Sequence, residues 1–488
     1  MHPLLIARVL GLFALLFGVT LTAPIGIALI HGETDLTPFL EPLAGSLVLG
    51  FVLWVGGELG PRLGGGAHGD LGVRDGFLIV ALFWFLLSTL GAWPLVLGVG
   101  LSPVDALFEA ASGLTTTGAT VITGLDALPR SLLFYRQELQ WLGGMGVVVL
   151  GLAIIPLLGI GGMQLYRAEA PGPLKEEKLT PRLVGTARSL WLLYLGLTAA
   201  CALGYWLAGM SVFDAVSHSL STVSTGGFST HDDSIGYYNS PVVEGVSIVF
   251  MLLAAINFGL HFVVWNKLDP RLYLRDPEAR SFLIFVFAVV LVVSLMLWLE
   301  HVYPGPLKGV REAAFTVVSL VTSTGFATVD HAHWPDFLPV LLMIAAFVGG
   351  CGGSTAGGIK VLRVVLLSKQ GLYEVRRLIH PRAMTPVRVG NRVVDAQLMQ
   401  SVWGYFALYM MTFVLCGLWM IHAGLDPVSA FAAVATSINN LGPGLGEVAY
   451  NFQTVSDQGK LVAVAAMLLG RLEIFTILVL LTPGFWRG

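Results

Sequence analysis

Ser221-Thr222-Val223-Ser224-Thr225-Gly226-Gly227-Phe228-Ser229-Thr230 is a polar, glycine-bearing segment between two long apolar runs. Three related segments occur elsewhere in the chain: Thr115-Thr116-Thr117-Gly118-Ala119-Thr120, Thr322-Ser323-Thr324-Gly325-Phe326-Ala327-Thr328 and the looser Asn439-Asn440-Leu441-Gly442-Pro443-Gly444. Aligning the four gives the anchor glycines Gly118, Gly226, Gly325 and Gly442. Recurrence along the chain predicts four structural repeats, and we expect each repeat to contribute one wall of a shared site.

The composition is that of a membrane protein. The chain has 488 residues, of which 55% are hydrophobic and only 12% are charged, and its mean hydropathy is +0.79. Several apolar runs exceed the roughly 20 residues that a helix needs to span hydrocarbon. The first of these, from Leu4, has no small-residue cleavage site, so we expect a retained helix. The three cysteines have no metal-ligand spacing and predict neither a disulfide framework nor a zinc site.

Apolar runs at 4–30 and 41–57 predict a leading helical hairpin, and the remainder follows one plan four times. Each unit reads as a first long helix, a short amphipathic helix, the polar glycine segment and a second long helix. The first helices are predicted at 76–100, 188–209, 281–301 and 397–423, and the second at 132–160, 241–265, 335–367 and 459–482. The expected fold is therefore an all-α integral membrane protein with ten spans. Its predicted divisions are 1–74 (hairpin), 75–165, 166–280, 281–392 and 393–488 (repeats 1 to 4).

The basic residues test this topology independently. Most of the 27 Lys and Arg residues fall in the termini and loops that this predicted topology places on one side of the membrane, including the 163–188, 266–280 and 360–392 loops. The positive-inside rule then makes both termini cytoplasmic. Every polar glycine segment faces the outside, where Asp232, Asp233, Asp330 and Asp336 would raise the local cation concentration.

The short helices carry their own start signals. Ser102 and Ser211 each precede an acid by three residues, and Asp426 is followed by proline. A dozen residues reach roughly 18 Å, which is only partway through a hydrocarbon core of about 30 Å. We therefore expect re-entrant half-helices whose C-terminal ends, the negative ends of their dipoles, point inward at the glycine segments.

The glycine segments suit a cation. Rings of backbone carbonyls from several loops can replace a cation's hydration shell, while glycine permits the required backbone angles and small hydroxyl side chains keep the approach narrow. The alternative is a set of polar turns that only pack helices together. Four copies, three of them behind capped half-helices, favour the carbonyl ring.

The four segments resemble the filter segments of the Trk/Ktr/HKT superfamily of cation transporters. Further similarity to the membrane subunits of bacterial Trk systems lies in Gln140-Trp141-Leu142-Gly143-Gly144-Met145-Gly146, Ala170-Pro171-Gly172-Pro173, the glycine-rich run from Gly349 to Lys360 and Gly470-Arg471-Leu472-Glu473. The resemblance covers nearly the whole chain. It implies potassium uptake across a bacterial inner membrane, a homodimer with one pore per subunit, and a cytosolic nucleotide-binding regulatory ring of the TrkA type. No enzymatic activity, bound organic cofactor or nucleic-acid partner is expected.

The resemblance also assigns residues to the filter. The carbonyls facing K⁺ would come from Thr116, Thr117, Gly118, Ser224, Thr225, Gly226, Ser323, Thr324, Gly325, Asn440, Leu441 and Gly442. The fourth segment departs from the Thr-Gly pattern, because Leu441 offers no hydroxyl. Coordination there would be by the backbone alone, and the four-fold equivalence is approximate.

A glycine-rich run interrupts the second helix of repeat 3. It reads Gly349-Gly350-Cys351-Gly352-Gly353-Ser354-Thr355-Ala356-Gly357-Gly358, with six glycines in ten residues, so the helix must break or loosen in mid-membrane. We interpret it as a gate loop under the filter; close helix packing is the alternative. A phosphate-binding loop is disfavoured because Lys360 is not preceded by glycine and not followed by serine or threonine, as that motif requires.

Two charged features accompany this run. Arg471 lies deep inside an apolar run, where a charge faces either a cavity or a partner on another helix. The basic 360–392 loop is either a docking face for a cytosolic partner or an anchor near anionic lipid.

A few residues would suit two other functions. An ion-coupled symporter of the same architecture would need proton carriers, for which Glu473, Glu138 and His261 are the few candidates. A membrane-embedded hydrolase is suggested by His218 near Ser221 and Ser224, but the nucleophile context Gly-x-Ser-x-Gly is missing.

Overall fold

The chain opens with two antiparallel helices, α1 (Pro3–Thr20) and α3 (Thr37–Leu63), joined through α2 (Thr22–His31). The computed structural model describes residues 1–63, 72–149, 183–335, 337–380, 386–390 and 392–487. The two helices approach closely where both carry glycine: a Cβ at Gly11 would meet the backbone of Trp54 and Gly50 within 3.0 Å. The predicted leading hairpin is confirmed.

Four helical units follow the hairpin. Their first helices are α4 (Val73–Val99), α8 (Leu183–Leu207), α13 (Pro277–Leu299) and α17 (Ala396–His422). Their half-length helices are α5 (Pro103–Leu114), α9 (Val212–Val223), α14 (Pro306–Val321) and α18 (Pro427–Asn439). Their second helices are α6 (Arg130–Val149), α10 (Pro241–Ala254) with α11 (Phe258–Lys267), α15 (Phe337–Ala346) with α16 (Val361–Ile379), and α19 (Asp457–Arg471) with α20 (Phe475–Leu480). The predicted all-α class with four repeats is confirmed.

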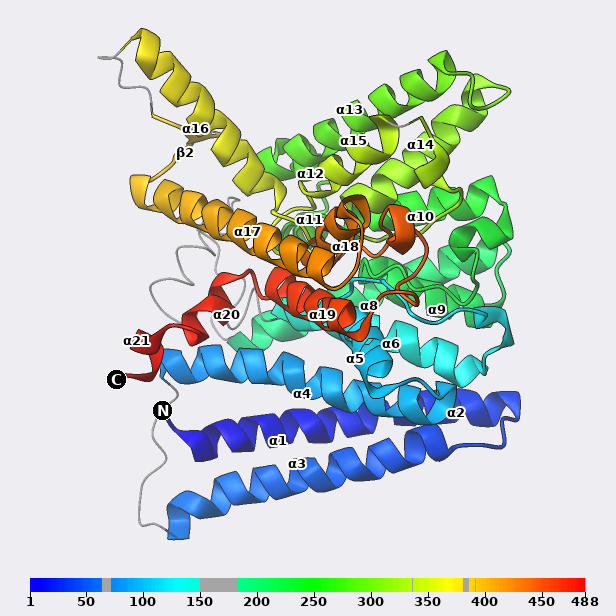
Figure 1. Ribbon diagram of the computed structural model, residues 1–488, viewed down its shortest axis with the longest axis vertical. Helices are drawn as coiled ribbons and strands as arrows, with labels where there is room; N and C mark the ends of the chain where they lie inside the picture. The colour runs from blue at the N-terminus through cyan, green and yellow to red at the C-terminus, as the bar shows by residue number, and fades with distance from the viewer. Residues whose placement is uncertain (64–71, 150–182, 336, 381–385, 391, 488) are drawn as a thin grey trace.

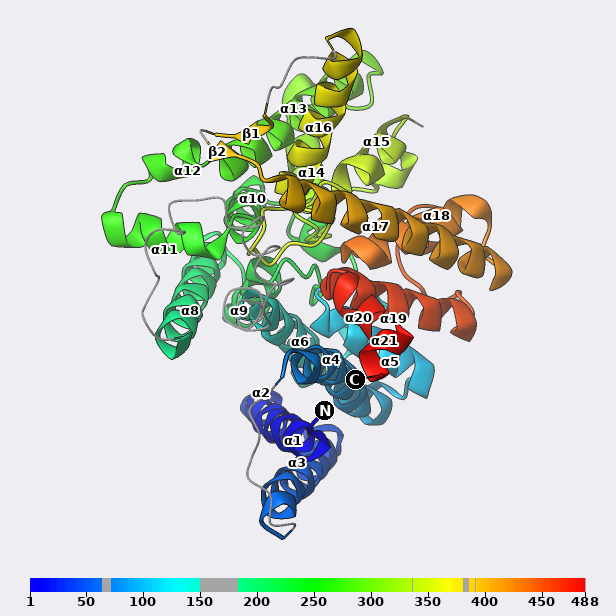
Figure 2. The ribbon, with the colours of Figure 1, turned by 90° about the vertical axis from the view of Figure 1, so that its left-hand side faces the viewer.

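Short elements connect these helices. They are the 3₁₀ turns η1 (Leu125–Ala127), η5 (Ser234–Tyr238), η6 (His331–His333) and η7 (Gly446–Val448), the helices α12 (Arg271–Arg275) and α21 (Pro483–Trp486), and the antiparallel pair β1 (Arg388–Val389) and β2 (Arg392–Val393). Both views place α1 and α3 at one end of the molecule and α13 at the other, with the two termini close together (Figures 1 and 2).

The half-length helices begin as their sequences predict. Ser102 Oγ accepts a hydrogen bond from the amide of Asp105, and Ser211 Oγ accepts one from Asp214, each at 3.1 Å. Asp426 Oδ1 accepts from Val428 and Ser429 at 2.9 and 3.2 Å. The fourth, α14, begins after Gly305 with proline in its first turn and without a side-chain cap. These caps satisfy amides that have no partner within the helix.

The second helices differ from the prediction. The runs 241–265 and 459–482 were expected to be continuous, but α10 and α11 meet at a bend of 99°, and α19 ends before Glu473 and Ile474, which both have positive φ. In repeat 3 the expected break between α15 and α16 is confirmed. Apolar composition predicts burial in the membrane, but a helix interrupted by one or two residues has the same composition as a straight one.

In the part of the chain that the structure describes, fewer continuous spans are found than the predicted ten. Within the described residues, six helices are long and apolar enough to cross a membrane, or seven if α10 and α11 count as one span. The end of the predicted helix 132–160, residues 163–182 of the predicted 163–188 loop with the Ala170-Pro171-Gly172-Pro173 motif, and the division at residue 165 lie outside the described residues. Residues 183–188 were expected to belong to the loop, but they form the start of α8.

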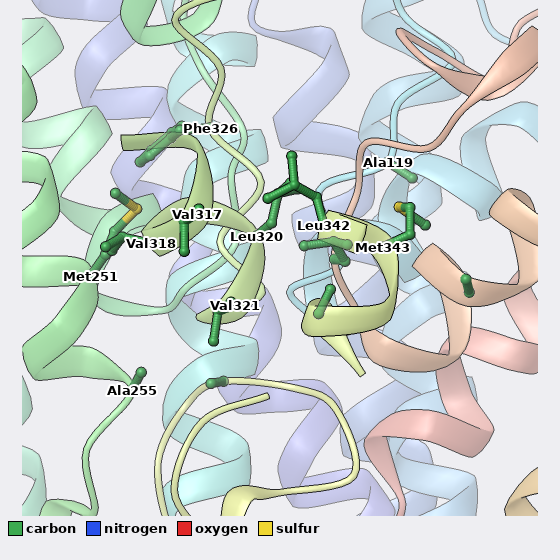
Figure 3. Packing of buried hydrophobic residues seen from close by; sticks show 14 of the residues in the cluster. Ala119, Met251, Ala255, Val317, Val318, Leu320, Val321, Phe326, Leu342 and Met343 are labelled. Carbon is green, nitrogen blue, oxygen red and sulfur yellow. The ribbon is translucent and has the colours of Figure 1, made fainter. Parts of the chain in front are cut away.

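The core of the molecule surrounds the half-length helices. Figure 3 shows buried side chains of α14, including Val317, Val318, Leu320 and Val321, close to Met251 and Ala255 on one flank and Leu342 and Met343 on another. The C-terminal part of this re-entrant helix, from Phe315 to Val321, is thus surrounded by protein. This arrangement allows its irregular C-terminal end to exist at membrane depth.

A buried ion pair joins α5 to α6. Both Nε and Nη2 of Arg136 donate to Glu109 Oε1, at 2.9 and 2.7 Å, and both side chains are essentially inaccessible. Glu109 also accepts from the hydroxyl of Thr120 and the amide of Val121. The guanidinium lies 4.2 Å from the ring centroid of Phe228 in repeat 2. One ion pair therefore supports two neighbouring loops.

Arg136→Met is expected to lower the free energy of unfolding by about 3–5 kcal/mol, because it leaves the Glu109 charge buried without compensation. The melting temperature of the detergent-solubilised protein measures this loss. The double variant Glu109→Gln/Arg136→Met should recover most of it. A single variant as stable as the parent protein would contradict this account.

Candidate functional site

The backbone enters the left-handed region at the end of every half-length helix. The φ angles are +56° at Thr116, +54° at Thr225, +54° at Ser323 and +52° at Asn440. The following amide donates to the carbonyl five residues earlier in each copy: Thr117 to Ser112, Gly226 to Ser221, Thr324 to Ser319 and Leu441 to Thr436, at 2.8–2.9 Å. Such a conformation costs of order 1–3 kcal/mol in a residue other than glycine. Its presence at four equivalent positions indicates one enforced geometry.

A glycine of positive φ follows two residues after each of these positions. The four are Gly118 (+79°), Gly227 (+83°), Gly325 (+82°) and Gly442 (+93°). The alignment on Gly226 is therefore wrong by one residue: Gly226 corresponds to Thr117, and Ser224 corresponds to Thr115. The second segment contains two consecutive glycines, and only backbone conformation distinguishes the one that must be left-handed.

The four segments close into a ring. A Cβ added at Gly118 would meet the carbonyl oxygen of Gly226 within 3.0 Å. The same relation recurs from Gly227 to the carbonyl of Thr324, from Gly325 to that of Leu441, and from Gly442 to that of Thr117. Each glycine thus lies against the carbonyl of the next segment, and the last lies against the first. The sequence prediction of four walls around one site agrees with this arrangement.

Gln140 on α6 supports the second segment. Its Nε2 donates to the carbonyl of Gly226 at 2.7 Å, while its Oε1 accepts from Ser221 Oγ at 2.7 Å and from the amide of Phe228 at 3.1 Å. A Cβ at Gly226 would overlap the Gln140 amide. Gly226 is therefore required by this side chain, whereas Gly227 is required by the ring.

Hydroxyl groups brace the first and third segments in the same way. Thr115 and Thr117 share a hydrogen bond between their Oγ1 atoms at 2.8 Å, as do Thr322 and Thr324. Leu441 cannot do this, but its neighbour Asn440 donates from Nδ2 to Thr117 Oγ1 at 3.0 Å. The side chain of the fourth segment therefore ties the last repeat to the first.

Loops on the predicted outer side form a second set of contacts between repeats. The amide of Gly124 donates to Asp232, that of Gly236 to the Ala327 carbonyl, and that of Phe452 to the Thr120 carbonyl, at 2.8–3.0 Å. Tyr450 donates to Asp330. These bonds connect repeat 1 with 2, 2 with 3, 3 with 4, and 4 with 1.

The run from Gly349 to Gly358 is a non-helical loop that touches three of the four segments. The amide of Gly357 donates to Ser323 Oγ at 2.6 Å, and Thr355 Oγ1 donates to the carbonyl of Val223 at 3.1 Å. A Cβ at Gly357 would overlap the carbonyl of Asn439. The expected position of this loop, directly against the polar segments, agrees with these contacts.

Arg471 points toward this loop. Its Nη1 donates to the carbonyl of Thr355 at 2.9 Å, whereas its Nε and Nη2 have no hydrogen-bond partner in the described part of the chain. The neighbouring carboxylate of Glu473 pairs instead with Arg363, at 2.7 Å. This geometry places Arg471 against the loop, and the ion pair to another helix is made by Glu473.

Known proteins resemble this chain along its whole length. The family model for TrkH, a cation transport protein, matches residues 65–485. The chain belongs to the TrkH family. It is 49% identical to the Trk system potassium uptake protein TrkH of Vibrio parahaemolyticus, over 99% of each chain, and 48% identical to TrkH of Escherichia coli over the full length of both. The crystal structure of the potassium transporter TrkH from Vibrio parahaemolyticus superposes with a TM-score of 0.91 at 46% identity, covering both chains completely.

Membership in the TrkH family rules out the membrane-embedded hydrolase, since this is a family of cation transporters and not of enzymes. The geometry gives the same result. The ring nitrogens of His218 contact the carbonyl of Asp214 and Ser229 Oγ, both at 2.9 Å, whereas Ser221 donates to Gln140. His218 is not paired with the serines suggested by the sequence.

A histidine bridges repeats 1 and 2 at the outer rim. His231 Nδ1 lies 2.5 Å from Asp126 and its Nε2 lies 3.7 Å from Asp214, while Tyr237 stacks on the ring. Burial alone would lower the pKa of His231, but the nearby negative charges of Asp214 and Asp126, together with the hydrogen bond to Asp126, outweigh burial and raise it. The folded protein therefore favours the charged imidazolium.

A raised pKa stabilises the fold below the unfolded value of about 6.5, and this stabilisation is lost as the pH rises through the higher folded value. The melting temperature should therefore decrease as the pH rises above 6.5. His231→Gln should flatten this part of the profile. An identical slope in the variant would show that other groups dominate.

Proposed function

We propose that this chain mediates potassium uptake across a bacterial inner membrane through a pore lined by the four glycine segments. The observation that carries the proposal is the closed ring in which each glycine lies against the carbonyl of the next segment. Four converging backbones can replace the hydration shell of a cation with oxygens. Potassium is the ion named for the relatives that align with the chain over its full length.

The proposed filter carbonyls follow the corrected register. They are those of Thr116, Thr117 and Gly118, Thr225, Gly226 and Gly227, Ser323, Thr324 and Gly325, and Asn440, Leu441 and Gly442. Alternation of positive and negative φ along each triplet supports the proposal, because it aims successive carbonyls to one side of the backbone. The bond from Gln140 to Gly226 makes the second wall different from the others.

The run Gly349–Gly358 is proposed to be the gate, with Arg471 holding it. It lies against three filter segments and is joined to Arg471 through Thr355. Its downstream helix α16 leads into the basic segment that we propose as the docking face for a TrkA-type cytosolic ring. A homodimer, cytoplasmic termini and the five sequence divisions belong to the same proposal; the proximity of the two termini supports a common side (Figure 1).

A coupled symporter is a second candidate because of Glu138. This side chain is 7% exposed, and its Oε2 has no hydrogen-bond partner within the described residues. A buried carboxyl group of this kind is able to carry a proton. Reversal potentials in liposomes under imposed potassium, sodium and proton gradients separate the two mechanisms: passive conduction follows the potassium gradient alone.

Gly118→Ser, Gly227→Ser and Gly325→Ser are expected to lower the potassium to sodium flux ratio in liposomes, by about tenfold for a cost of 1.4 kcal/mol at one coordinating carbonyl. A Cβ at each position would displace a carbonyl of the ring. Gly209→Ser is the matched control: it strains a left-handed glycine outside the ring that has no atom within 4 Å of its Cβ position, so it should lower the melting temperature without changing the flux ratio. Unchanged selectivity in all three ring variants would overturn the filter proposal.

Arg471→Ala is expected to raise potassium flux, because it removes both a fixed positive charge near the cation path and the hydrogen bond that holds Thr355. Arg471→Lys retains the charge and serves as the control. Flux from liposomes containing the pure protein, without a cytosolic partner, measures the difference. Reduced flux in a well-folded Ala variant would contradict the proposed role.

A further inference from the structure

The bend between α10 and α11 is an interruption of a buried helix. The two helices meet at 99°, and the three residues between them, Ala255, Ile256 and Asn257, are buried. Asn257 caps α11, since its Oδ1 accepts from the amides of Gly259 and Leu260 at 2.7 and 3.3 Å. A break at membrane depth leaves further backbone groups that the helix itself no longer satisfies.

The Gly349–Gly358 loop satisfies those groups. The amide of Cys351 donates to the Ala255 carbonyl at 2.8 Å, and the amide of Thr355 donates to the Ala254 carbonyl at 3.4 Å. In the other direction, the amide of Phe258 donates to the Gly353 carbonyl at 3.0 Å. The bend and the loop therefore complete each other's hydrogen bonding.

One residue of the loop, Gly352, is hydrogen-bonded through both its carbonyl and its amide. The Gly352 carbonyl accepts from Asn257 Nδ2 at 2.7 Å, and the Gly352 amide donates to Glu278 Oε1, also at 2.7 Å. Glu278 lies in the first turn of α13, and Asn257 begins α11. The side-chain amide of Asn257 thus has two tasks: its oxygen caps α11, and its nitrogen positions the loop.

In an uninterrupted helix, the amide of Phe258 would donate to the carbonyl of Ala254, four residues earlier. In the structure both groups are bonded to the loop instead. Each unpaired backbone group in hydrocarbon is costly, so the loop cannot leave unless these two groups find new partners. They are each other's partners in a straight helix.

We propose that the α10–α11 bend is the second half of the gate, with Asn257 as its positioning residue. The bend holds the loop closed, and when the loop withdraws, the Phe258 amide pairs with the Ala254 carbonyl and the bend straightens. This inference rests on the proposed gate function of the loop. Straightening would also move α11, which ends at Lys267, so that a change at the filter reaches the far end of α11.

The test uses the full-length protein with Cys351 as its only cysteine, after Cys201→Ala and Cys416→Ala. Cys351 is 1% exposed, so its rate of reaction with a membrane-permeant maleimide reports movement of the loop without any ion flux. Asn257→Ser keeps an N-cap oxygen but loses the nitrogen that reaches Gly352, whereas Asn257→Ala loses both. Ser456→Ala, which removes the cap of α19 away from the loop, is the matched control.

Both Asn257 variants should increase Cys351 labelling by about fivefold, the equilibrium change for one lost hydrogen bond, and partner-free potassium flux should rise with it. The control should change neither. An effect of Asn257→Ala without any effect of Asn257→Ser would assign Asn257 to capping alone and overturn the proposal, as would unchanged labelling in both folded variants.

Labelling also separates this proposal from the proposed function. If the parent protein transports no potassium, the proposed function is wrong. The labelling of Cys351 still shows whether Asn257 holds the loop. If neither variant folds, hydrogen exchange of the parent protein decides it: segments 254–259 and 350–356 should exchange with one common rate constant. Independent rates would show that bend and loop move separately.

Discussion

The structure depends on one constraint: a carbonyl of each polar segment lies where the Cβ of a neighbouring glycine would be. This contact cannot be made by one repeat, and no segment can shift without displacing the next. The left-handed residues, the hydroxyl pairs and the Gln140 amide all serve to hold it. Glycine is thus a steric requirement of the ring as well as a conformational one. The buried C-terminal halves of the half-length helices supply a rigid base for it.

The sequence predicted most of the fold because its signals are local. Apolar runs of membrane length, serine and aspartate caps, and the recurrence of Thr-Gly segments each depend on a few neighbouring residues. The breaks at Asn257 and Glu473 were not predicted. Asn257 is stabilised by Gly352, which lies 95 residues away, and Glu473 by Arg363, 110 residues away. Interruptions that depend on distant partners carry no local pattern.

The sequence predicted which segments would be irregular, but it did not predict the register of the second glycine segment. Residues Gly349–Gly358 were identified because six glycines cannot sustain a helix, and Arg471 because a lone charge in an apolar run is costly. The assignment of Gly226 failed, since both glycines of the pair fit the motif and only the side chain of Gln140 distinguishes their surroundings. Gln140 begins the Gln140–Gly146 motif, yet nothing in the sequence indicated that its side chain contacts the second glycine segment.

The ring closes between the two ends of the chain's repeats. Asn440 donates to Thr117 across 323 residues, and Phe452 donates to Thr120. During synthesis the first three walls are complete long before the fourth leaves the ribosome, and contacts of such sequence separation form late in folding. A nascent chain that ends before the fourth segment therefore has an open ring, in which the first and third walls lack the neighbour that holds them in the complete protein.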